Sequence, residues 1–345
     1  MPNVTIRDVA REAAVSVASV SRVMNGMGNV TPALRRRVET AAAALGYVPH
    51  AGARNLSLAR ANAIGVVLPD IHGEFFSEVL RGMDREASDR GLQLLLSNMH
   101  ADADLAVQAL RTMRGRVDGM VVMAPHVDPD QLFAQLPPGV PVVLVNCAPH
   151  HDKRPEIRTD NSGGAIAMVD HLVAVGRRRI VHVSGPQGNI EAAERAQGYS
   201  AAMARHGLSP RIIPGTFMEE SGAEAAEVLL RDLQAVDAVF AANDMMAIGA
   251  LMAFRRAGVA VPDRVAVAGF DDIPLARLVS PSLTTIRAGI AGVGARAIAR
   301  LAAAIAGDGD DTVELSIPEL VPRETTALTD RQQARITGQQ RGTRS

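Results

Sequence analysis

The strongest structural signal in this chain lies in the run Thr5-Ile-Arg-Asp-Val-Ala-Arg-Glu-Ala-Ala-Val-Ser-Val-Ala-Ser-Val-Ser-Arg-Val-Met-Asn25. The run predicts two short helices, because Thr5 can cap the first, with Asp8 in the capping-box position, and Ser16 can cap the second. Between them, Ala14-Val15 leaves only a few residues, so the two helices must pack at a steep angle. This geometry indicates a helix-turn-helix of the kind that reads DNA.

The second predicted helix has two distinct faces. Val20 and Val23, together with Met24, can face inward. The side chains that stay outside, where they can meet base edges, are Val17, Ala18, Ser21 and Arg22. Arg22 carries a five-donor fork that can pair with O6 and N7 of a guanine, worth roughly 1 to 3 kcal/mol of discrimination. Arg22 is therefore the main candidate for reading a base.

The remaining candidates for DNA contact divide by chemistry. Val17 and Ala18 have no hydrogen-bonding groups, so they can offer only apolar contact, for instance to a thymine methyl. Ordinary core packing is the alternative for Val17. Hydroxyl and amide side chains suit phosphate contacts, which fix register without reading sequence. The phosphate candidates are Thr5, Ser16, Ser21, Asn25 and Tyr47.

A third helix completes a small bundle. Thr31-Pro32 supplies an N-cap and a first-turn proline, and Gly46 stops the helix after Leu45. The next stretch, residues 47 to 58, allows about nine helical residues at most after Pro49, fewer than the ~12 to 15 that an isolated helix needs in water. We therefore expect this stretch to be helical only with help from a partner.

Composition sets the class of protein and its surroundings. The chain has 345 residues, of which 47% are hydrophobic, and this suits two or three globular domains. It has no apolar run of eighteen residues and no signal-peptide h-region, so we expect a cytoplasmic protein without a membrane partner. The single cysteine, Cys147, follows an apolar run and is expected to be a buried, inert thiol. One cysteine also excludes an internal disulfide and a multi-cysteine zinc site.

The charge distribution is uneven along the chain. The formal net charge is only −1, yet residues 1 to 60 hold eight arginines against three acidic residues. A basic N-terminal segment followed by an acidic remainder of the chain is expected when the N-terminal segment binds DNA phosphates and the remainder does not. A solvated basic face would explain the charge alone, but the charge coincides with the helix-turn-helix pattern.

From Ala61 onward, short apolar runs alternate with amphipathic helices. The predicted strands are Ile64 to Leu68, Leu92 to Leu96, Met120 to Met123, Val142 to Val145, Ile180 to Val183, Val236 to Ala241 and Val265 to Ala268. The predicted helices are Glu74 to Arg90, Ala101 to Arg114, Gly163 to Val175, Glu191 to His206, Ser221 to Asp232, Asp244 to Ala257 and Ala291 to Ala306. This alternation predicts an α/β fold with two doubly wound parallel sheets, and places ligand chemistry at the carboxyl ends of the strands.

Three other patterns are interpreted as having no catalytic or metal role. The run Gly292-Val-Gly294-Ala-Arg-Ala297 fits a loose dinucleotide fingerprint but falls inside a helical period, not at a strand-to-helix turn. His150-His151 is interpreted as a polar loop, because adjacent histidines do not easily converge on one metal. The polar tail, residues 327 to 345, lacks apolar heptads and is expected to be disordered.

Several separated motifs together cover about residues 4 to 326. At the N-terminal end they are Val4-Thr-Ile-Arg-Asp-Val-Ala, Val15-Ser, Ser19-Val-Ser-Arg-Val-Met-Asn25, Leu45-Gly-Tyr-Val-Pro49 and Ala53-Arg-Asn-Leu56. In the body they are Thr159-Asp-Asn161, Glu194-Arg195, Gly198-Tyr199, Ala242-Asn-Asp244, Gly269-Phe-Asp-Asp272, Leu283-Thr-Thr-Ile286 and Leu320-Val-Pro-Arg-Glu324. In this order, they resemble the lactose/galactose-repressor family of bacterial transcription regulators.

The resemblance implies a domain organisation. It comprises a helix-turn-helix headpiece (residues 1–48), a hinge helix (49–60), a first effector-core subdomain (61–160 plus 288–316), a second one (161–287 plus 317–326) and a tail (327–345). The two core subdomains would be periplasmic-binding-protein-like, joined by three crossovers. His50 and Gly52 depart from the family's usual hinge residues, which are asparagine at the first position and a better helix former at the second.

The resemblance also assigns roles to hinge and core residues. Ala53 and Leu56 would contact DNA from the hinge, with Leu56 as a wedge in the minor groove; the alternative is a linker leucine packed on the core. Small-molecule effector contacts would come from Phe75, Phe76, Asp160, Arg195, Phe217, Asn243 and Asp271. Taken singly, Asp271 could instead cap a turn, and the two adjacent phenylalanines could be core.

These expectations combine into one function. The chain is expected to be a ligand-responsive transcriptional regulator, most simply a repressor, that binds a palindromic DNA operator as a homodimer with half-sites about 34 Å apart. A sugar, sugar phosphate or nucleoside-like effector would bias operator binding, and no cofactor is expected. The rival interpretations are an enzyme or a solute-binding protein on the same α/β core with an appended DNA-binding module. No nucleophile elbow, Walker loop or zinc motif supports the enzyme.

Overall fold

The computed structural model describes residues 4–25, 30–47, 60–136, 139–150 and 153–327. The chain divides into two compact units, residues 1–62 with 115–118, and residues 63–114 with 119–345. The predicted hinge, most of residues 49–60, lies outside the described residues, as does the predicted tail beyond residue 327.

The first unit contains the three predicted helices, α1 (Ile6–Glu12), α2 (Val17–Met24) and α3 (Pro32–Leu45). The predicted caps are confirmed: the Ser19 amide donates to Ser16 Oγ at 3.1 Å, and Gly46 ends α3 with a φ of +63°. The buried core of this bundle comprises Val9, Ala10, Ala13, Val20, Val23, Val38, Ala41 and Ala42. Small apolar side chains therefore form the contact between these helices.

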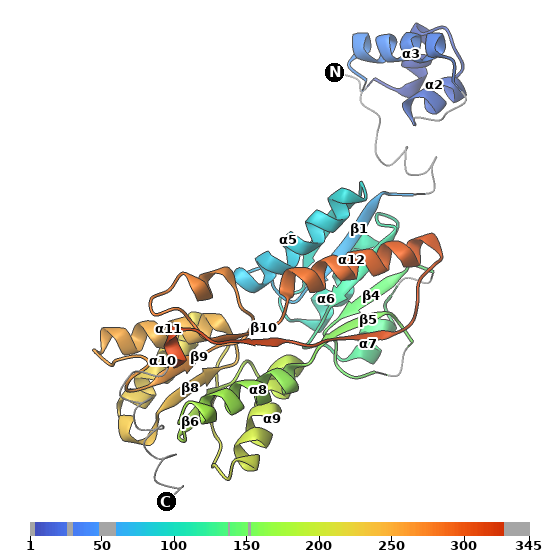
Figure 1. The fold of residues 1–345 in the computed structure, drawn as a ribbon. Helices are drawn as coiled ribbons and strands as arrows, with labels where there is room; N and C mark the ends of the chain where they lie inside the picture. Colours follow the sequence, from blue (N-terminus) through green and yellow to red (C-terminus); the bar gives the residue numbers. More distant parts are fainter. Residues whose placement is uncertain (1–3, 26–29, 48–59, 137–138, 151–152, 328–345) are drawn as a thin grey trace, which may run out of the picture. The chain divides into compact units, whose positions relative to one another are not determined.

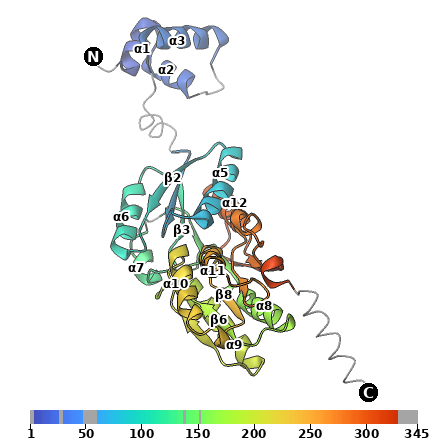
Figure 2. The same cartoon turned by 90° about the vertical axis from the view of Figure 1, so that its left-hand side faces the viewer.

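The second unit has two lobes, each built on a parallel sheet, as predicted. In the first lobe the described strands form a six-stranded sheet in the order β11 (Val313–Ser316), β5 (Glu156–Thr159), β4 (Val142–Val145), β3 (Gly119–Met123), β1 (Ala63–Leu68) and β2 (Gln93–Asn98). Its helices are α5 (Glu74–Asp89), α6 (Ala103–Met113), α7 (Pro129–Phe133) and α12 (Ile290–Ala306). Helices α6 and α7 lie on one side of this sheet, with α5 and α12 on the other (Figure 2).

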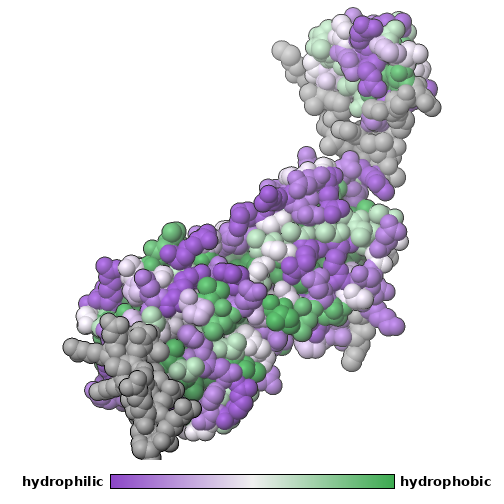
Figure 3. Space-filling model, viewed as in Figure 1, coloured by the Kyte–Doolittle hydropathy of each residue, from purple (hydrophilic) through white to green (hydrophobic). Residues whose placement is uncertain are grey.

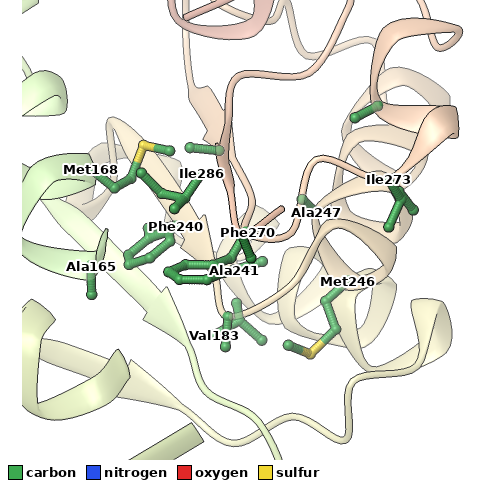
Figure 4. Close-up of a cluster of buried hydrophobic side chains, with 14 of the residues drawn as sticks. Ala165, Met168, Val183, Phe240, Ala241, Met246, Ala247, Phe270, Ile273 and Ile286 are labelled. Carbon is green, nitrogen blue, oxygen red and sulfur yellow. The ribbon is translucent and has the colours of Figure 1, made fainter. Parts of the chain in front are cut away.

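The second lobe repeats the plan with fewer strands. Its sheet has the order β7 (Arg211–Ile213), β6 (Ile180–Val183), β8 (Ala238–Ala241) and β9 (Ala266–Ala268). Its helices are α8 (Asn161–Ala174), α9 (Ile190–Arg205), α10 (Glu219–Leu230) and α11 (Asp244–Arg256). Helix α8 packs against α9, and α10 packs against α11. The buried cluster beneath them includes Phe240, Phe270, Met168 and Ile286 (Figure 4).

Two short antiparallel strands, β10 (Thr285–Arg287) and β12 (Glu319–Val321), run between the lobes (Figure 1). Since β11 pairs in the first sheet while β12 pairs with β10, the chain passes from one lobe to the other more than once. The subdomain boundaries expected from the sequence are compatible with this strand order and stay a prediction.

One glycine of the dinucleotide-like run, Gly294, is explained by helix packing. Gly292 and Gly294 lie inside α12, not at a strand-to-helix turn. A Cβ on Gly294 would lie 2.3 Å from the Val79 carbonyl oxygen, and one on Gly82 of α5 would lie 1.9 Å from the carbonyl oxygen of Ala291. These glycines let α5 and α12 approach backbone to backbone.

Some element boundaries differ from the predictions. Strand β8 begins at Ala238, not at Val236, because residues Leu233–Ala235 form a 3₁₀ turn and Asp237 binds the main-chain amides of Arg178 and Arg179. The sequence analysis also missed the short helix α7 and five strands of three or four residues, β5, β7, β10, β11 and β12.

The described surface mixes hydrophilic and hydrophobic side chains (Figure 3). On the face of the second unit that Figure 3 shows, hydrophobic residues form separate patches between hydrophilic ones. Three exposed apolar side chains, Val313, Leu315 and Ile317, follow one another at alternate positions on and after β11. Among the described residues, no helix is long and apolar enough to cross a membrane.

Candidate DNA-binding and effector sites

The recognition helix α2 has the two faces that the sequence predicts. Val20 and Val23 are buried, whereas Val17 is 41% exposed and Ala18 and Arg22 are exposed. Exposure of Val17, rather than core packing, is therefore confirmed. Arg22 Nε donates to the carbonyl oxygen of Ala18 at 3.3 Å, one turn back on the same helix. The base contacts of these side chains stay predictions.

The predicted phosphate-contacting residues lie around the ends of these helices. Thr5 donates from its amide and its hydroxyl to Asp8 at 3.0 and 2.6 Å, which confirms the capping box. Thr5 and Ser16 are exposed, whereas Ser21, Asn25 and Tyr47 are half-buried. Asn25 Nδ2 donates to Ser21 Oγ at 3.3 Å. The other two predicted DNA contacts, Ala53 and Leu56, lie outside the described residues.

Most of the predicted effector residues line one cavity in the second unit. Its volume is about 180 Å³, and six of the seven predicted residues line it: Phe75, Phe76, Arg195, Phe217, Asn243 and Asp271. They come from both lobes, Phe75 and Phe76 from the start of α5 and the others from the second lobe. Most of the lining follows the carboxyl ends of strands, where a doubly wound fold binds its ligands.

Asp160 is the predicted residue that the structure places elsewhere. It does not line the cavity. Its Oδ1 accepts a hydrogen bond from the Gly163 amide at 2.8 Å, so its carboxylate caps helix α8. Its neighbour Asn161 is the residue that contacts the site, because its Oδ1 accepts from Arg195 Nε at 2.8 Å. Neither Asp160 nor Asn161 lines the cavity, so the placement of Asp160 in the cavity wall was wrong, and Asn161 acts on the cavity only by fixing Arg195.

Arg195 is the buried cation of the cavity wall. Only 3% of the residue is exposed. Besides the bond to Asn161, its Nη1 donates to the carbonyl oxygen of Ala242 at 2.6 Å, and its guanidinium carbon lies 4.0 Å from the ring centre of Phe270. Its Nη2 lies 3.6 Å from Asp271 Oδ1 and 3.7 Å from Glu191 Oε1. The guanidinium is thus fixed in place, with Nη2 left between two carboxylates.

Among the described residues, Asp271 is one of three cavity-lining residues with a buried polar atom that lacks a hydrogen-bond partner; the other two atoms are Glu219 Oε2 and His126 Nδ1. Asp271 Oδ1 is buried and has no hydrogen-bond partner within the protein. Burial raises the pKa of its carboxyl to about 7; the Arg195 guanidinium opposes this rise and the carboxylate of Glu191 adds to it. The backbone of Asp271 has a φ of +112°, which few residues other than glycine adopt. Strain and an unpaired buried acceptor on the cavity wall are the features of a ligand-binding residue.

Asn243 fixes the backbone of the cavity wall at Phe217. Its Nδ2 donates to the carbonyl oxygen of Phe217 at 2.8 Å, and its Oδ1 accepts from the Met246 amide at 3.0 Å as the cap of α11. Phe217 itself has a φ of +70°. The hydrogen bonds of the Asn243 side chain therefore stabilise the backbone of the cavity wall.

Sequence reasoning missed several residues of the site. The additional side chains and backbone positions that line the cavity are Pro69, Asp70, His72, Gly73, Glu74, His126, Pro186, Thr216, Met218, Glu219 and Met245. It also missed Glu191, a buried carboxylate beside Arg195. The four-residue spacing of Glu191 and Arg195 on a predicted helix is the signal that could have found this pair.

Other chemically notable groups lie apart from this cavity. Cys147 is buried, as predicted, and burial raises the pKa of its thiol to about 12. His150 lies in the loop between β4 and β5, as predicted, but its side chain is buried there with its Nε2 3.1 Å from Glu156 Oε2. His151 lies outside the described residues. Across the described ranges, no group of three or more histidine, cysteine or acidic residues could hold a metal ion.

A helix-turn-helix unit, joined in one chain to a two-lobed α/β core with a polar and aromatic cavity, defines a ligand-responsive DNA-binding regulator. Residues 5–50 match the model of bacterial regulatory proteins of the lacI family, and residues 169–326 match a periplasmic binding protein-like domain. The chain belongs to the lacI family.

Two curated relatives show the extent of the similarity. The chain is 35% identical over 326 residues to catabolite control protein A of Priestia megaterium, covering 93% of this chain and 97% of that protein. It is 37% identical over 289 residues to the ribose operon repressor of Escherichia coli strain K12, covering 82% and 87%.

Two solved structures show the same likeness in three dimensions. The Lac repressor dimer bound to operator and the anti-inducer ONPF matches with a TM-score of 0.85 and 27% identity, covering 94% of this chain and 99% of that one. The complex of the transcriptional regulator CelR with cellobiose matches with a TM-score of 0.69 and 30% identity, covering 94% and 100%.

Proposed function

We propose that this protein is a transcriptional repressor that binds a palindromic operator as a homodimer and responds to a small neutral sugar held in the cavity described above. The observation that carries the effector part is the unpaired, buried Oδ1 of Asp271, beside Arg195 and under aromatic side chains. We assign it no catalytic activity, and we place it in the cytoplasm, where a bacterial regulator meets its DNA.

The shape and lining of the cavity favour a sugar. Aromatic side chains such as Phe217 can stack on the apolar face of a sugar ring, while carboxylates and guanidinium groups bind vicinal hydroxyls. A volume of about 180 Å³ is small beside the roughly 300 to 1,000 Å³ of clefts that take drug-sized ligands. One ring therefore suits this cavity better than a disaccharide.

The charges of the cavity favour a neutral effector over a phosphorylated one. Arg195 is its buried guanidinium, and Asp271 and Glu191 already face it. Three further carboxylates, Asp70, Glu74 and Glu219, line the same cavity. A phosphate group would add about two negative charges to a wall that already holds an excess of them. A sugar hydroxyl can instead donate to Asp271 without adding charge.

The DNA-binding part rests on the exposed face of α2 and on the relatives. Arg22, Ala18 and Val17 are exposed on a helix whose other face is buried. The solved Lac repressor that this chain resembles is a dimer on its operator, and both curated relatives described above are named as regulators. Two copies of a headpiece on one palindrome explain why a short recognition helix can suffice.

A thermal-shift screen tests the effector assignment. The panel of neutral sugars is ribose, galactose, glucose and cellobiose. Ribose 5-phosphate, glucose 6-phosphate and cytidine are tested separately as ligands of the alternative chemical classes. A ligand at a hundred times its Kd stabilises the folded protein by about 2.7 kcal/mol, so the melting temperature must rise for a neutral monosaccharide. A rise with a sugar phosphate alone, or with cytidine alone, would contradict the neutral-sugar effector.

A further inference from the structure

A buried carboxylate joins the two lobes beside the cavity. Glu191 lies on α9 of the second lobe and is 5% exposed. Its Oε1 accepts a hydrogen bond from Asn146 Nδ2 at 2.8 Å, and Asn146 follows β4 of the first lobe. Asn146 is itself fixed, because its Oδ1 accepts from the Thr159 amide at 2.9 Å. Glu191 is therefore held at a defined place by a neighbour that cannot easily move.

Glu191 and Asp271 face the same nitrogen of Arg195. The distances from Nη2 are 3.7 Å to Glu191 Oε1 and 3.6 Å to Asp271 Oδ1. Arg195 cannot turn further toward either carboxylate, because its Nε and Nη1 are bound to Asn161 and Ala242. A single positive charge is thus shared by two buried carboxylates, and neither is fully compensated.

We propose that Glu191 is a positioning residue of the effector site: by sharing the Arg195 guanidinium with Asp271, it sets the pH range in which Asp271 accepts hydrogen bonds from a bound sugar. This inference rests on the proposed function. Glu191 does not line the cavity, so it acts on the sugar only through Arg195 and Asp271.

The electrostatics of the site give the proposal a direction. Burial raises the pKa of Asp271 to about 7, and the carboxylate of Glu191 contributes to that rise. The ionised form of Asp271 is the better acceptor for a sugar hydroxyl, so sugar affinity is expected to increase with pH through about 7 and to level off above about 8. Removing the charge of Glu191 leaves Arg195 to Asp271 alone, which lowers the pKa of Asp271.

Other charged groups near Asp271 lie on several elements. Asp244 begins α11 and is buried; Asp271 contributes to the raised pKa of Asp244. Asp272, next in the chain, is paired with Arg287 and Arg323. In the cavity, burial alone lowers the pKa of His126 below its usual value. Burial also raises the pKa of Glu191, and the nearby Glu194 adds to that rise, so the titration of Glu191 itself contributes to the wild-type profile and is absent from Glu191→Gln. A substitution at Glu191 changes none of the other pairings directly.

The experiment measures sugar affinity by calorimetry from pH 5.5 to 8.5, with the full chain and the panel member that stabilises it most. Glu191→Gln keeps an amide oxygen for Asn146 and removes the charge. Glu224→Gln, an exposed position on α10, is the matched control. For a downward shift of one pH unit in the midpoint, Glu191→Gln binds the sugar about fivefold more tightly than the wild type at pH 6, while the two converge above pH 8.

The outcomes separate this inference from the function on which it rests. A merely structural Glu191 would give Glu191→Gln a uniform loss of affinity with an unchanged midpoint, and that result overturns the proposal. If the variant does not fold, the wild type still decides, because a flat profile with normal sugar binding overturns the inference and leaves the proposed function standing. Absence of binding by all four sugars at every pH overturns both.

Discussion

Arg37 of α3 donates from Nε and Nη2 to the carbonyl oxygen of Ala13, at 3.0 and 2.8 Å. Ala13 ends α1, and the same Nη2 also reaches the carbonyl oxygen of Ala14 at 3.0 Å. The guanidinium thereby binds the carbonyl groups that the end of α1 leaves without helical partners. The third helix thus holds the turn that sets the angle of the recognition helix.

Substituting Arg37 tests this role. Arg37→Ala is expected to destabilise the headpiece by about 1 kcal/mol, because the hydrogen bonds join a charged donor to main-chain carbonyls at an exposed position. Hydrogen exchange of the α2 amides should become about fivefold faster. Arg36→Ala removes the same charge from the same helix and is the control. Equal acceleration in both variants would show that only net charge matters.

Ala14 offers a change in the opposite direction. Its φ is +48°, a left-handed conformation that costs an L-residue roughly 1 to 2 kcal/mol. Glycine adopts it freely but loses about 0.5 to 1 kcal/mol through the entropy of the unfolded chain. Ala14→Gly is therefore expected to stabilise the headpiece slightly and to slow exchange of the α2 amides about twofold. Faster exchange in this variant would mean that the turn is not strained.

The sequence predicted the fold well wherever hydrophobic periodicity was strong. The β4 and β6 strands were predicted to the residue, because each is a short buried run between clear breaks, apolar throughout in β4 and apolar except for His182 in β6. Strand β5, by contrast, contains Glu156 and Arg158, and its burial depends on the contacts of Glu156 with His150 and Arg158. The local sequence does not predict β5 as a strand, because its charged residues are neutralised by contacts that form only in the folded protein.

In the effector cavity, too, some residues were predicted from the sequence and others were not. Arg195 and Asp271 lie in motifs quoted for the family resemblance, Phe217 was assigned from that resemblance without a motif of its own, and all three line the cavity. The roles of Asp160 and Glu191 depend on side-chain direction, which sequence alone does not give. Asp160 turns back to cap α8, whereas Glu191, one turn before Arg195, turns inward and becomes a second partner of its guanidinium.

His182 gives a prediction for the pH dependence of stability. It is fully buried on β6, and burial lowers its pKa to about 4. Between pH 6.5 and 4, His182 is protonated in the unfolded chain but stays neutral in the folded chain. The stability that depends on neutral His182 is therefore fully present above pH 6.5 and is lost as the pH falls. The loss between pH 6.5 and 5 is on the order of 2 kcal/mol.

The measurement is urea denaturation of wild type and His182→Phe at pH 7.5 and 5.0. The aromatic ring keeps the contacts with Tyr199 and Phe240, so the variant is expected to lose less stability than the wild type on acidification. Buried carboxylates such as Asp271 respond to pH in the opposite sense, and comparing the two proteins cancels them. The same loss in both proteins would exclude His182 as the titrating group.

Arg22 carries the prediction for DNA reading. Arg22→Ala is expected to weaken specific operator binding by roughly 1 to 3 kcal/mol, about 5- to 150-fold, because a bidentate contact to guanine is lost. Arg7→Ala, at an exposed position on α1, removes a charge without removing that contact and is the control. Competition binding against random duplex DNA measures both effects. A loss of the same size on random duplex would make Arg22 a phosphate contact.

The central claim is that a neutral sugar in the cavity controls operator binding. Its most direct test selects a high-affinity duplex from a randomised pool with the full chain, then measures binding to that duplex by fluorescence anisotropy at fixed salt, with and without a saturating sugar. The account predicts a palindromic duplex whose affinity changes 5- to 150-fold with the sugar. Operator affinity that is identical with and without a sugar that demonstrably occupies the cavity would contradict it.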